Sequence, residues 1–331
     1  LEEVLADYVG TKHCVGVSSG TDSLLIALMA LGVGQGDEVV TVSYTWISTA
    51  EVIALVGAKP VFVDIDPDTW NMDSAQLERA VSERTKAIIP VGIYGQTADM
   101  DAINEIANRH NIPVIEDVAQ SFGATYKGRK SCSLSTIGST SFFPSKPLGG
   151  FGDGGALFTD DDDMAEKFRQ IRVHGQAHKH HHPVLGLNGR LDTMQAAILR
   201  IKLRKLDEYK SARNRAATFY DKAFTNCAGL TIPFRNPDSD HAFHQYTLQT
   251  NGYDRDGLKE HLSSKNIPAM IYYPVPLHKQ EAFRTANYKE PVLQITDDLC
   301  SRVISLPIHT EMEEEQLDYI QKMIINLKFQ I

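Results

Sequence analysis

The first half of the chain alternates short apolar runs with segments of helical periodicity, and this order restricts the fold more than any other feature. The predicted strands lie near residues 13–17, 38–41, 60–63, 87–91, 113–116, 136–143 and 156–159, and the predicted helices span residues 22–31, 48–55, 74–81 and 100–108. Strands that are separated by helices pair in parallel and bury both faces of their sheet. We therefore predict an α/β fold with a mostly parallel sheet that helices cover on both sides.

The pattern changes after Asp192, where one long helical period extends to about residue 224. The apolar side of this period carries Met194, Ala197, Ile198, Ile201 and Leu206. Shorter strands and helices in mixed order follow it. With 331 residues and 42% hydrophobic content, the chain is long enough to form two cores. We predict a large domain of residues 1–205 and a smaller α+β domain of residues 206–331.

The composition argues against several classes of partner and site. A net charge of -9 without a basic tract argues against a nucleic-acid partner, and it requires any anionic substrate to be held by local groups. No apolar run is long enough to cross a bilayer and no signal peptide is recognisable, so we expect a cytoplasmic protein without membrane association. The cysteines stand singly without a CxxC pair, which predicts neither a disulfide framework nor a zinc ribbon.

Lys146 lies between a predicted strand and a glycine-rich turn. The apolar run of residues 136–143 stops at Pro144, so Lys146 should emerge where the strand ends, and open α/β sheets bind their ligands at such ends. Apolar surroundings lower the pKa of a lysine ammonium, and a neutral amine can form an imine with an aldehyde. The alternative is a surface lysine beside a turn, and this stretch alone leaves both interpretations open.

The segment from Ser18 to Asp22, Ser-Ser-Gly-Thr-Asp, ends the first predicted strand and opens a helix. Free backbone N–H groups, hydroxyls and the positive end of a helix dipole would meet there, which suits a phosphate group. An ordinary N-cap at Thr21 or Asp22 is the alternative. The segment lacks the lysine of a P-loop, so it does not indicate nucleoside triphosphate chemistry.

Asp117 and Trp46 also follow predicted strands. Asp117 comes directly after the apolar run of residues 113–116, where a cationic partner such as a protonated pyridine nitrogen could hold it ionised. A helix cap or a loop carboxylate is the other interpretation, and the residues leave this choice open. Trp46 offers a flat apolar face that can stack on a ring, although aromatic residues at such places usually belong to the core or to a lid.

Two other motifs carry weaker signals. Gly150, Gly152 and Gly155 match GxGxxG, but a strand follows where a dinucleotide site needs a helix, so we interpret them as places where backbone passes close to a ligand. The histidines within residues 178–182 could suggest a metal site. Their loop ends at Pro183 and has no nearby carboxylate or thiolate, so we predict a solvated or substrate-facing loop and no metal.

Taken in this order, these stretches resemble the nucleotide-sugar aminotransferases of the DegT/DnrJ/EryC1/StrS family, pyridoxal-phosphate enzymes of the aspartate aminotransferase fold (fold type I). The resemblance covers nearly the whole chain. It rests on SSGTDSL from Ser18, GDEVV from Gly36, Trp46, GAKPVFVDID from Gly57, IPVIEDVAQSFGA from Ile112, SFFPSKPLG from Ser141, GDGGA from Gly152 and NGRLDTMQAAIL from Asn188. Because the chain opens at Leu1 in an amphipathic segment, we also expect that its natural N-terminal segment is missing.

The resemblance implies a role for each matching residue. It makes Lys146 the Schiff-base lysine and proton shuttle, Asp117 the partner of the pyridine nitrogen, and Gln120 the contact of the ring hydroxyl. Trp46 would stack on the ring. The cofactor phosphate would be bound by Gly20, Thr21, Ser141 and, from the second subunit of a homodimer, Asn188.

The segments TKAIIPVGIYGQ, SFFPSKPLGG and RVHGQ are most similar to those of one group of family members. These members aminate C3 of a UDP-linked 2-acetamido-3-keto-hexuronic acid for O-antigen assembly, with L-glutamate as donor. The guanidinium of Arg190, with His174 shortly before it, could bind the carboxylate of such a sugar, and an arginine that only ties loop to helix is the alternative. Tyr272 and Tyr273 fall at a substrate contact where relatives often carry His-Tyr-Pro.

Three other functions stay open at this point. The substrate could be another keto sugar nucleotide, such as a dTDP-3-keto or a UDP-4-keto-6-deoxy sugar. A pyridoxal-phosphate sugar dehydratase is a lyase alternative, but such relatives carry histidine where this chain has Lys146. A regulatory protein that has lost catalysis is disfavoured because Lys146, Asp117 and Gln120 are all present.

Overall fold

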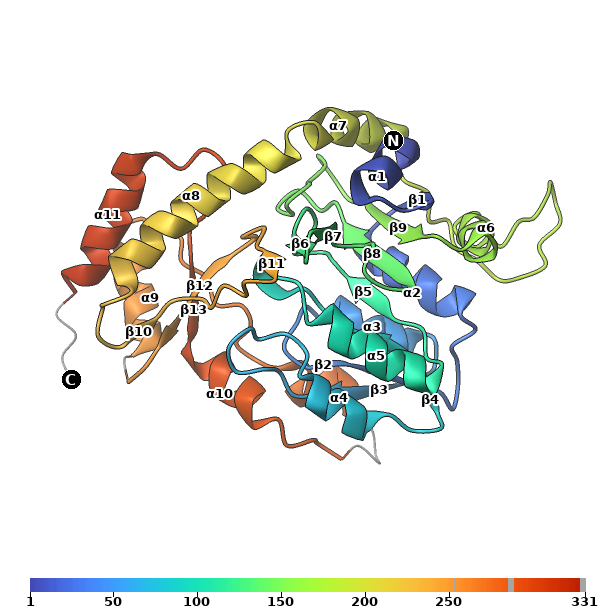
Figure 1. The fold of residues 1–331 in the computed structure, drawn as a ribbon, viewed down its shortest axis with the longest axis horizontal. Helices are drawn as coiled ribbons and strands as arrows, with labels where there is room; N and C mark the ends of the chain where they lie inside the picture. The colour runs from blue at the N-terminus through green and yellow to red at the C-terminus, as the bar shows by residue number, and fades with distance from the viewer. Residues whose placement is uncertain (253, 285–288, 328–331) are drawn as a thin grey trace.

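A computed structural model describes residues 1–252, 254–284 and 289–327 (Figure 1). The strands of its main sheet are β1 (His13–Val17), β2 (Glu38–Val42), β3 (Lys59–Val63), β4 (Thr85–Ile89), β5 (Ile115–Asp117), β8 (Ile137–Ser141) and β9 (Gly155–Thr159). Parallel bridges between Ile88 and Val114 and between Val91 and Asp117 join the two halves into the order β3-β2-β4-β5-β8-β9-β1. Only β9 runs antiparallel to its neighbours, so the predicted mostly parallel sheet is confirmed for the described residues.

Helices cover both faces of this sheet (Figure 1). One face packs against α2 (Gly20–Ala30), α3 (Ser48–Leu55) and α6 (Asp162–Ile171), and the other against α1 (Glu2–Val9), α4 (Ser74–Ala80), α5 (Met100–His110) and α7 (Thr193–Leu203). Neighbouring strand residues alternate between the two cores: Ile89 belongs to the first and Ile88 to the second. Strands buried on both faces explain the continuous apolar runs of the sequence.

The prediction of one long helix from residue 192 to residue 224 is wrong, because the structure contains two helices there. α7 ends at Leu203, the N–H of Lys205 donates to the carbonyl of Lys202, and α8 (Leu206–Phe224) follows in a new direction. Of the predicted apolar side, Leu206 is buried, but the residues on α7 are not the ones that pack into the core. Met194 and Ile201 are 75% and 67% exposed, whereas Leu199 and Leu203 pack into the core.

The C-terminal part builds a second core. β10 (Leu230–Thr231), β12 (Tyr246–Thr250) and β13 (Val303–Leu306) form an antiparallel sheet that packs with α8, α9 (Arg255–Ser264) and α11 (Glu314–Ile325). α10 (Gln294–Arg302) instead adds Leu299 to the core of the main sheet. The C-terminal part thus has a core of its own, while α10 shares the apolar surface of the main sheet. The domain boundary at residue 206 stays a prediction.

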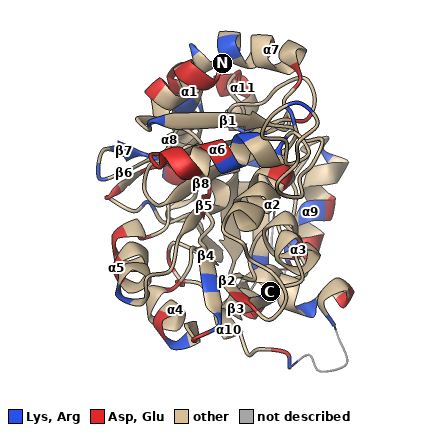
Figure 2. Cartoon of the chain, turned by 90° about the vertical axis from the view of Figure 1, so that its right-hand side faces the viewer, with Lys and Arg blue, Asp and Glu red and all other residues tan. Residues whose placement is uncertain are grey.

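Smaller elements complete the described chain. They are the strands β6 (Thr125–Tyr126), β7 (Arg129–Lys130) and β11 (Ser239–Asp240), which form a small sheet, and the single turns η1 (Ile93–Gly95), η2 (Leu277–Lys279) and η3 (Glu281–Phe283). Figure 2 shows basic and acidic residues interspersed along α4, α5 and α6, without a continuous basic stripe on this side of the described chain. Within residues 1–252, 254–284 and 289–327, no helix combines the length and apolar character that crossing a membrane requires.

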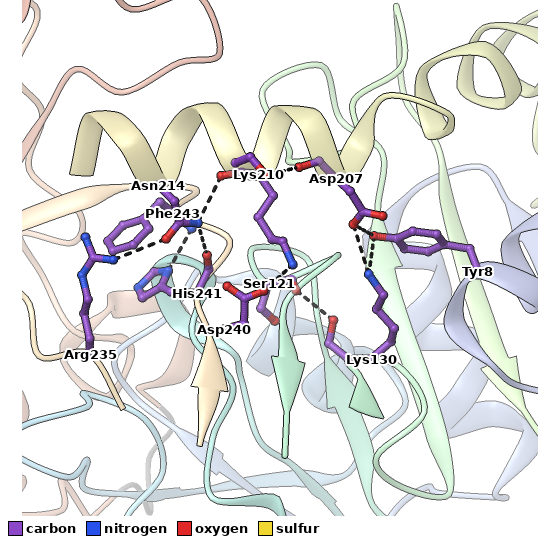
Figure 3. A network of polar contacts seen from close by, with 12 residues as sticks. Tyr8, Ser121, Lys130, Asp207, Lys210, Asn214, Arg235, Asp240, His241 and Phe243 are labelled. Atoms are coloured by element: carbon purple, nitrogen blue, oxygen red, sulfur yellow. Dashed lines mark hydrogen bonds and ion pairs between the residues drawn. The ribbon is translucent and has the colours of Figure 1, made fainter. Parts of the chain in front are cut away.

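Polar side chains of α8 tie it to both parts of the chain (Figure 3). Asp207 accepts hydrogen bonds from the hydroxyl of Tyr8 at 2.8 Å and from the ammonium of Lys130 at 3.1 Å. One turn farther along, Lys210 forms an ion pair with Asp240 of β11. α8 therefore spans the junction between the large sheet and the C-terminal part, and it holds the segment that follows β11.

Candidate active site

A cavity of about 370 Å³ lies at the carboxyl ends of β5 and β8, where the two parts of the chain meet. Its wall contains the predicted residues Gly20, Thr21, Trp46, Asp117, Gln120, Ser141, Lys146, Tyr272 and Tyr273. The parallel sheet explains this convergence, because its strands end at one edge and the helices that follow them begin there.

Lys146 lies in the turn that follows β8. The turn is fixed by hydrogen bonds from the N–H of Lys146 to the carbonyl of Phe143 at 2.8 Å and from the N–H of Phe143 to the hydroxyl of Ser141 at 3.2 Å. Gly149 lets the chain fold back tightly, because a Cβ there would lie 2.3 Å from the carbonyl oxygen of Pro144. Burial lowers the pKa of Lys146 and the charge of Asp117 opposes this, so the site favours the nucleophilic neutral amine.

The chain between Ser141 and Gly155 forms a closed loop that carries this turn. Its two ends pair with each other across the antiparallel strands β8 and β9. Inside the loop, the N–H of Phe142 donates to the carbonyl of Gly154 and the N–H of Gly150 donates to the carbonyl of Phe142, both at 2.7 Å. The strand after the glycines confirms that they do not open a dinucleotide-binding helix.

Asp117 ends β5 and is 5% exposed. Its Oδ2 accepts a hydrogen bond from the hydroxyl of Thr49 at 2.9 Å, and its Oδ1 accepts one from the N–H of Ala119 at 3.1 Å. Burial raises the pKa of Asp117, while these hydrogen bonds and the charge of Lys146 lower it. A buried carboxylate of this kind fits a cationic partner such as a protonated ring nitrogen.

Gln120 is fixed by contacts at both ends of its amide. Its Oε1 accepts from the N–H of Tyr94 at 2.9 Å, and its Nε2 donates to the hydroxyl of Tyr273 at 3.2 Å. The ring of Tyr273 lies 6.2 Å from that of Trp46, which is 57% exposed. The predicted stacking residue thus sits on the outer wall of the cavity, above the polar groups.

The N-terminus of α2 forms one end of the cavity. Ser19 caps the helix by accepting from the N–H of Asp22 at 3.0 Å, so neither Thr21 nor Asp22 is the cap. The hydroxyl of Thr21 contacts that of Ser48 at 2.8 Å. A Cβ at residue 20 would lie 2.5 Å from that of Ser141, so only glycine fits beside the end of β8. Hydroxyls and free N–H groups at a helix start suit a phosphate.

Several cavity residues were not predicted from the sequence. Thr49 and Ser48 begin α3, and a pair of hydroxyl residues at a helix start beside a predicted strand end was a usable signal. His244 and Gln245 also line the wall. They come from the segment between β11 and β12, and no local pattern indicates that this segment reaches Lys146.

Asn188, Arg190 and His174 are exposed and do not line the cavity of the single chain. Backbone bridges place Asn188 beside Val173 and Arg190 beside Val17, next to the edge strand β1. Their predicted contacts with phosphate and sugar stay predictions. The histidines within residues 178–182 are exposed, and the described residues contain no group of three or more His, Cys, Asp or Glu that could hold a metal ion.

Comparisons with known proteins agree with this geometry. Residues 1–325 match the DegT/DnrJ/EryC1/StrS aminotransferase family. The UDP-2-acetamido-2-deoxy-3-oxo-D-glucuronate aminotransferase of Pseudomonas aeruginosa is 49% identical over 98% of this chain and 89% of its own length. The UDP-N-acetyl-3-dehydro-alpha-D-glucosamine 3-aminotransferase of Acidithiobacillus ferrooxidans is 44% identical over 98% of this chain and 86% of its own length.

A solved structure gives the same result for the fold. The crystal structure of NtdA from Bacillus subtilis, with bound cofactor PMP, has a TM-score of 0.91 and 30% identity to this chain, and it covers 98% of this chain and 75% of that one. The predicted fold type is confirmed. With the family match, these comparisons also confirm the predicted enzyme class, and the chain belongs to the DegT/DnrJ/EryC1/StrS aminotransferase family.

Proposed function

We propose that this chain transfers the amino group of L-glutamate to C3 of a UDP-linked 2-acetamido-3-keto-hexuronic acid, with pyridoxal 5'-phosphate as cofactor. The observation that carries the proposal is the meeting of Lys146, Asp117 and the N-terminus of α2 in one cavity. The substrate is supported by the relative at 49% identity, whose name gives a UDP-3-oxo-glucuronate. The relative at 44% identity is also named for amination at C3 of a UDP sugar.

The cavity fits the three polar regions of pyridoxal phosphate. The helix start with Gly20, Thr21 and Ser141 would hold the phosphate, and Asp117 would hold the ring nitrogen in its protonated form. Lys146 lines the same cavity and would form the imine with the aldehyde carbon. When bound, the cofactor supplies a conjugated system into which the electrons of a carbanion can delocalise.

The remaining chemistry belongs to the side chains. Lys146, free once the donor amine has replaced it, would accept and hand on the proton that leaves Cα of glutamate, and in the second half of the cycle it would move a proton in the opposite direction. Burial lowers the pKa of this amine, which makes the neutral form easier to reach. Thr49 and the N–H of Ala119 keep Asp117 oriented throughout.

The proposed active unit is a homodimer with both sites at the interface. Exposed apolar side chains support it, because Phe143, Phe151, Met194 and Ile201 are each at least half exposed and Phe143 also lines the cavity. The loop that carries Phe151 is joined to α7 by a hydrogen bond from its N–H to Gln195 at 2.8 Å. A sedimentation experiment that finds a fully active monomer would refute this assembly.

A second chain would also supply positive charge that the cavity of the single chain lacks. Among the cavity-lining residues described here, Lys146 is the sole lysine or arginine, yet glutamate and a hexuronic acid both bring carboxylates. Arg190 on the exposed segment beside β1 is a cation that a second copy could insert, and Asn188 would accompany it to the phosphate. O-antigen assembly stays a prediction from the resemblance, and a cytoplasmic location stays a prediction from the sequence.

A substrate screen tests the reaction directly. The protein is incubated with L-glutamate and a panel of UDP- and dTDP-linked keto sugars, and mass spectrometry follows the aminated sugar and 2-oxoglutarate. Amination of the 3-keto-hexuronic acid ahead of all other sugars is the expected result. Preferred amination of a dTDP or 4-keto sugar would replace the proposed substrate, and dehydration without 2-oxoglutarate would favour a lyase. Lys146→Ala is the matched control.

A further inference from the structure

His244 lines the same cavity as Lys146, but the reaction described above gives it no role. Its side chain is 8% exposed, and its Nδ1 is buried without a hydrogen-bond partner among the described residues. Buried side-chain nitrogens are ordinarily hydrogen-bonded, and an exception needs an explanation. An unpartnered nitrogen in the wall of a reaction cavity points to a partner that arrives during the reaction.

The segment that carries His244 is held firmly from the side of α8. Arg213 donates to the carbonyl oxygens of Phe243 at 3.1 Å and of His244 at 3.3 Å. Asn214 donates to the carbonyl of His241 at 2.8 Å, as Figure 3 shows. Phe243 adopts a left-handed φ of 46°, a sparsely populated conformation that persists only where the surroundings impose it.

The large domain holds the same segment from the other side. The N–H of Ala242 donates to the carbonyl of Gly95 at 2.8 Å, and that of Gln245 donates to the carbonyl of Tyr94 at 3.2 Å. Tyr94 also binds the amide of Gln120, so the position of His244 is coupled to that of a predicted cofactor contact. Such placement from both domains suits a side chain with a positional role.

Among the charged groups, Lys146 has the largest effect on the pKa of the His244 imidazole. Burial lowers the pKa of His244 well below its ordinary value, and the positive charge of Lys146 and then that of Arg213 lower it further. The other titratable groups on the cavity wall are Asp117, Asp153, Tyr272 and Tyr273. A neutral imidazole has one donor and one acceptor nitrogen, so His244 can accept a hydrogen bond from an ammonium group.

We propose that His244 is a positioning residue that accepts a hydrogen bond from the amine of Lys146 while this lysine is detached from the cofactor. The inference rests on the proposed function, because an aminotransferase lysine is displaced by its donor and must stay close enough to move the proton. A neutral acceptor keeps the amine in reach without placing a second positive charge in the cavity. Asp117 is less suited to this task, because Thr49 and the ring nitrogen engage it.

The test measures the pKa of the Lys146 amine in the full chain loaded with pyridoxamine 5'-phosphate, where the lysine is unattached. The rate at which acetic anhydride labels Lys146 is followed against pH by peptide mass spectrometry. His244→Phe removes the acceptor, and His244→Asn keeps an acceptor oxygen near the position of Nδ1. His241→Asn is the matched control, because His241 lies on the same buried segment but does not line the cavity.

In His244→Phe, the pKa of Lys146 is expected to fall by about one, or roughly tenfold in the acid dissociation constant, because the ammonium loses a hydrogen bond. His244→Asn should restore most of the difference, and His241→Asn should leave the pKa at the wild-type value. An unchanged or raised pKa in His244→Phe would overturn the inference, as would an equal shift in His241→Asn. The measurement needs no sugar, so a wrong sugar assignment does not affect it, whereas failure of Lys146 to bind pyridoxal phosphate would refute the proposed function itself.

Discussion

Glu116, which precedes Asp117 in the chain, allows a direct test of how burial shifts the pKa of a carboxyl group next to the site. It precedes Asp117 on β5, points to the opposite face and is 3% exposed. Its Oε2 accepts from the N–H of Cys132 at 2.9 Å, but the structure gives it no ion pair among the described residues. Burial raises the pKa of the carboxyl from 4.5 to about 8, although the backbone N–H groups of Cys132 and Leu134 oppose this.

The size and sign of the effect follow from proton linkage. The folded protein keeps its proton to higher pH than the unfolded chain, so the contribution of Glu116 is fully present below pH 4.5 and is lost as pH rises through about 8. At about 1.36 kcal/mol per pH unit, the complete loss is roughly 5 kcal/mol. Between about pH 6 and about pH 9 it is roughly 2.5 kcal/mol.

The assay compares wild type with Glu116→Gln, which is neutral at every pH and keeps a carbonyl for the N–H of Cys132. Urea unfolding is measured across this pH range at fixed protein and cofactor concentrations, because ligands and assembly shift apparent stability. The wild-type protein should lose roughly 2.5 kcal/mol more than the variant. The difference between the two pH curves removes the contributions of the other titrating groups to the free energy of unfolding.

Glu38 is the matched control, since it is also buried but forms ion pairs with Arg84 and Lys59. Burial raises the pKa of Glu38, but hydrogen bonds from Arg84, Ser82 and Lys59 outweigh this and lower it to about 2. Its contribution is present above pH 4.5 and is lost as pH falls towards 2, so Glu38→Gln should alter the acid side of the curve. Parallel curves for wild type and Glu116→Gln above pH 6 would refute the reasoning.

The remaining predictions concern the cavity. Lys146→Ala should abolish both the visible absorbance of the imine and transamination, and a comparable rate would refute its role. Asp117→Asn should fold but turn over slower by orders of magnitude, because an amide does not hold the ring nitrogen protonated, and unchanged kinetics would contradict this. Gly20→Ala puts a Cβ 2.5 Å from that of Ser141, so cofactor titration should show weaker binding, and equal affinity would contradict phosphate binding at the start of α2. Arg190→Lys should raise the KM for the 3-keto-hexuronic acid far more than for its 6-hydroxymethyl counterpart, and equal losses would assign Arg190 to structure.

Much of the site could be predicted because a parallel sheet gathers the carboxyl ends of its strands. Asp117, Lys146 and Gly20 are far apart in sequence, yet each follows an apolar run, so their meeting follows from the alternation of strands and helices. The position of the α2 N-terminus at the cavity was predictable for a similar reason, although the cap is Ser19 and not the residues after it. Its binding of phosphate stays a prediction.

Other features depend on tertiary packing that leaves no local pattern. His244 reaches the cavity because Arg213 and the backbone of Tyr94 hold its segment, and neither contact has a sequence periodicity. The break after Leu203 was missed because apolar residues recur at helical spacing on both sides of it. The side of α7 that carries Met194 was misjudged because that side is apolar but exposed in the single chain.

The antiparallel pairing of β9 with β8 has a consequence for changes in chain length. Ser141 and Gly155 are paired directly, and both strands are central in the sheet, so neither end of the loop between them can slide without breaking a ladder. An inserted or deleted residue between these positions is therefore absorbed within the loop, which carries Lys146. The sheet would keep its register while the lysine moves relative to Asp117. Natural variation in length should accordingly be tolerated far better in the exposed histidine loop than in this one.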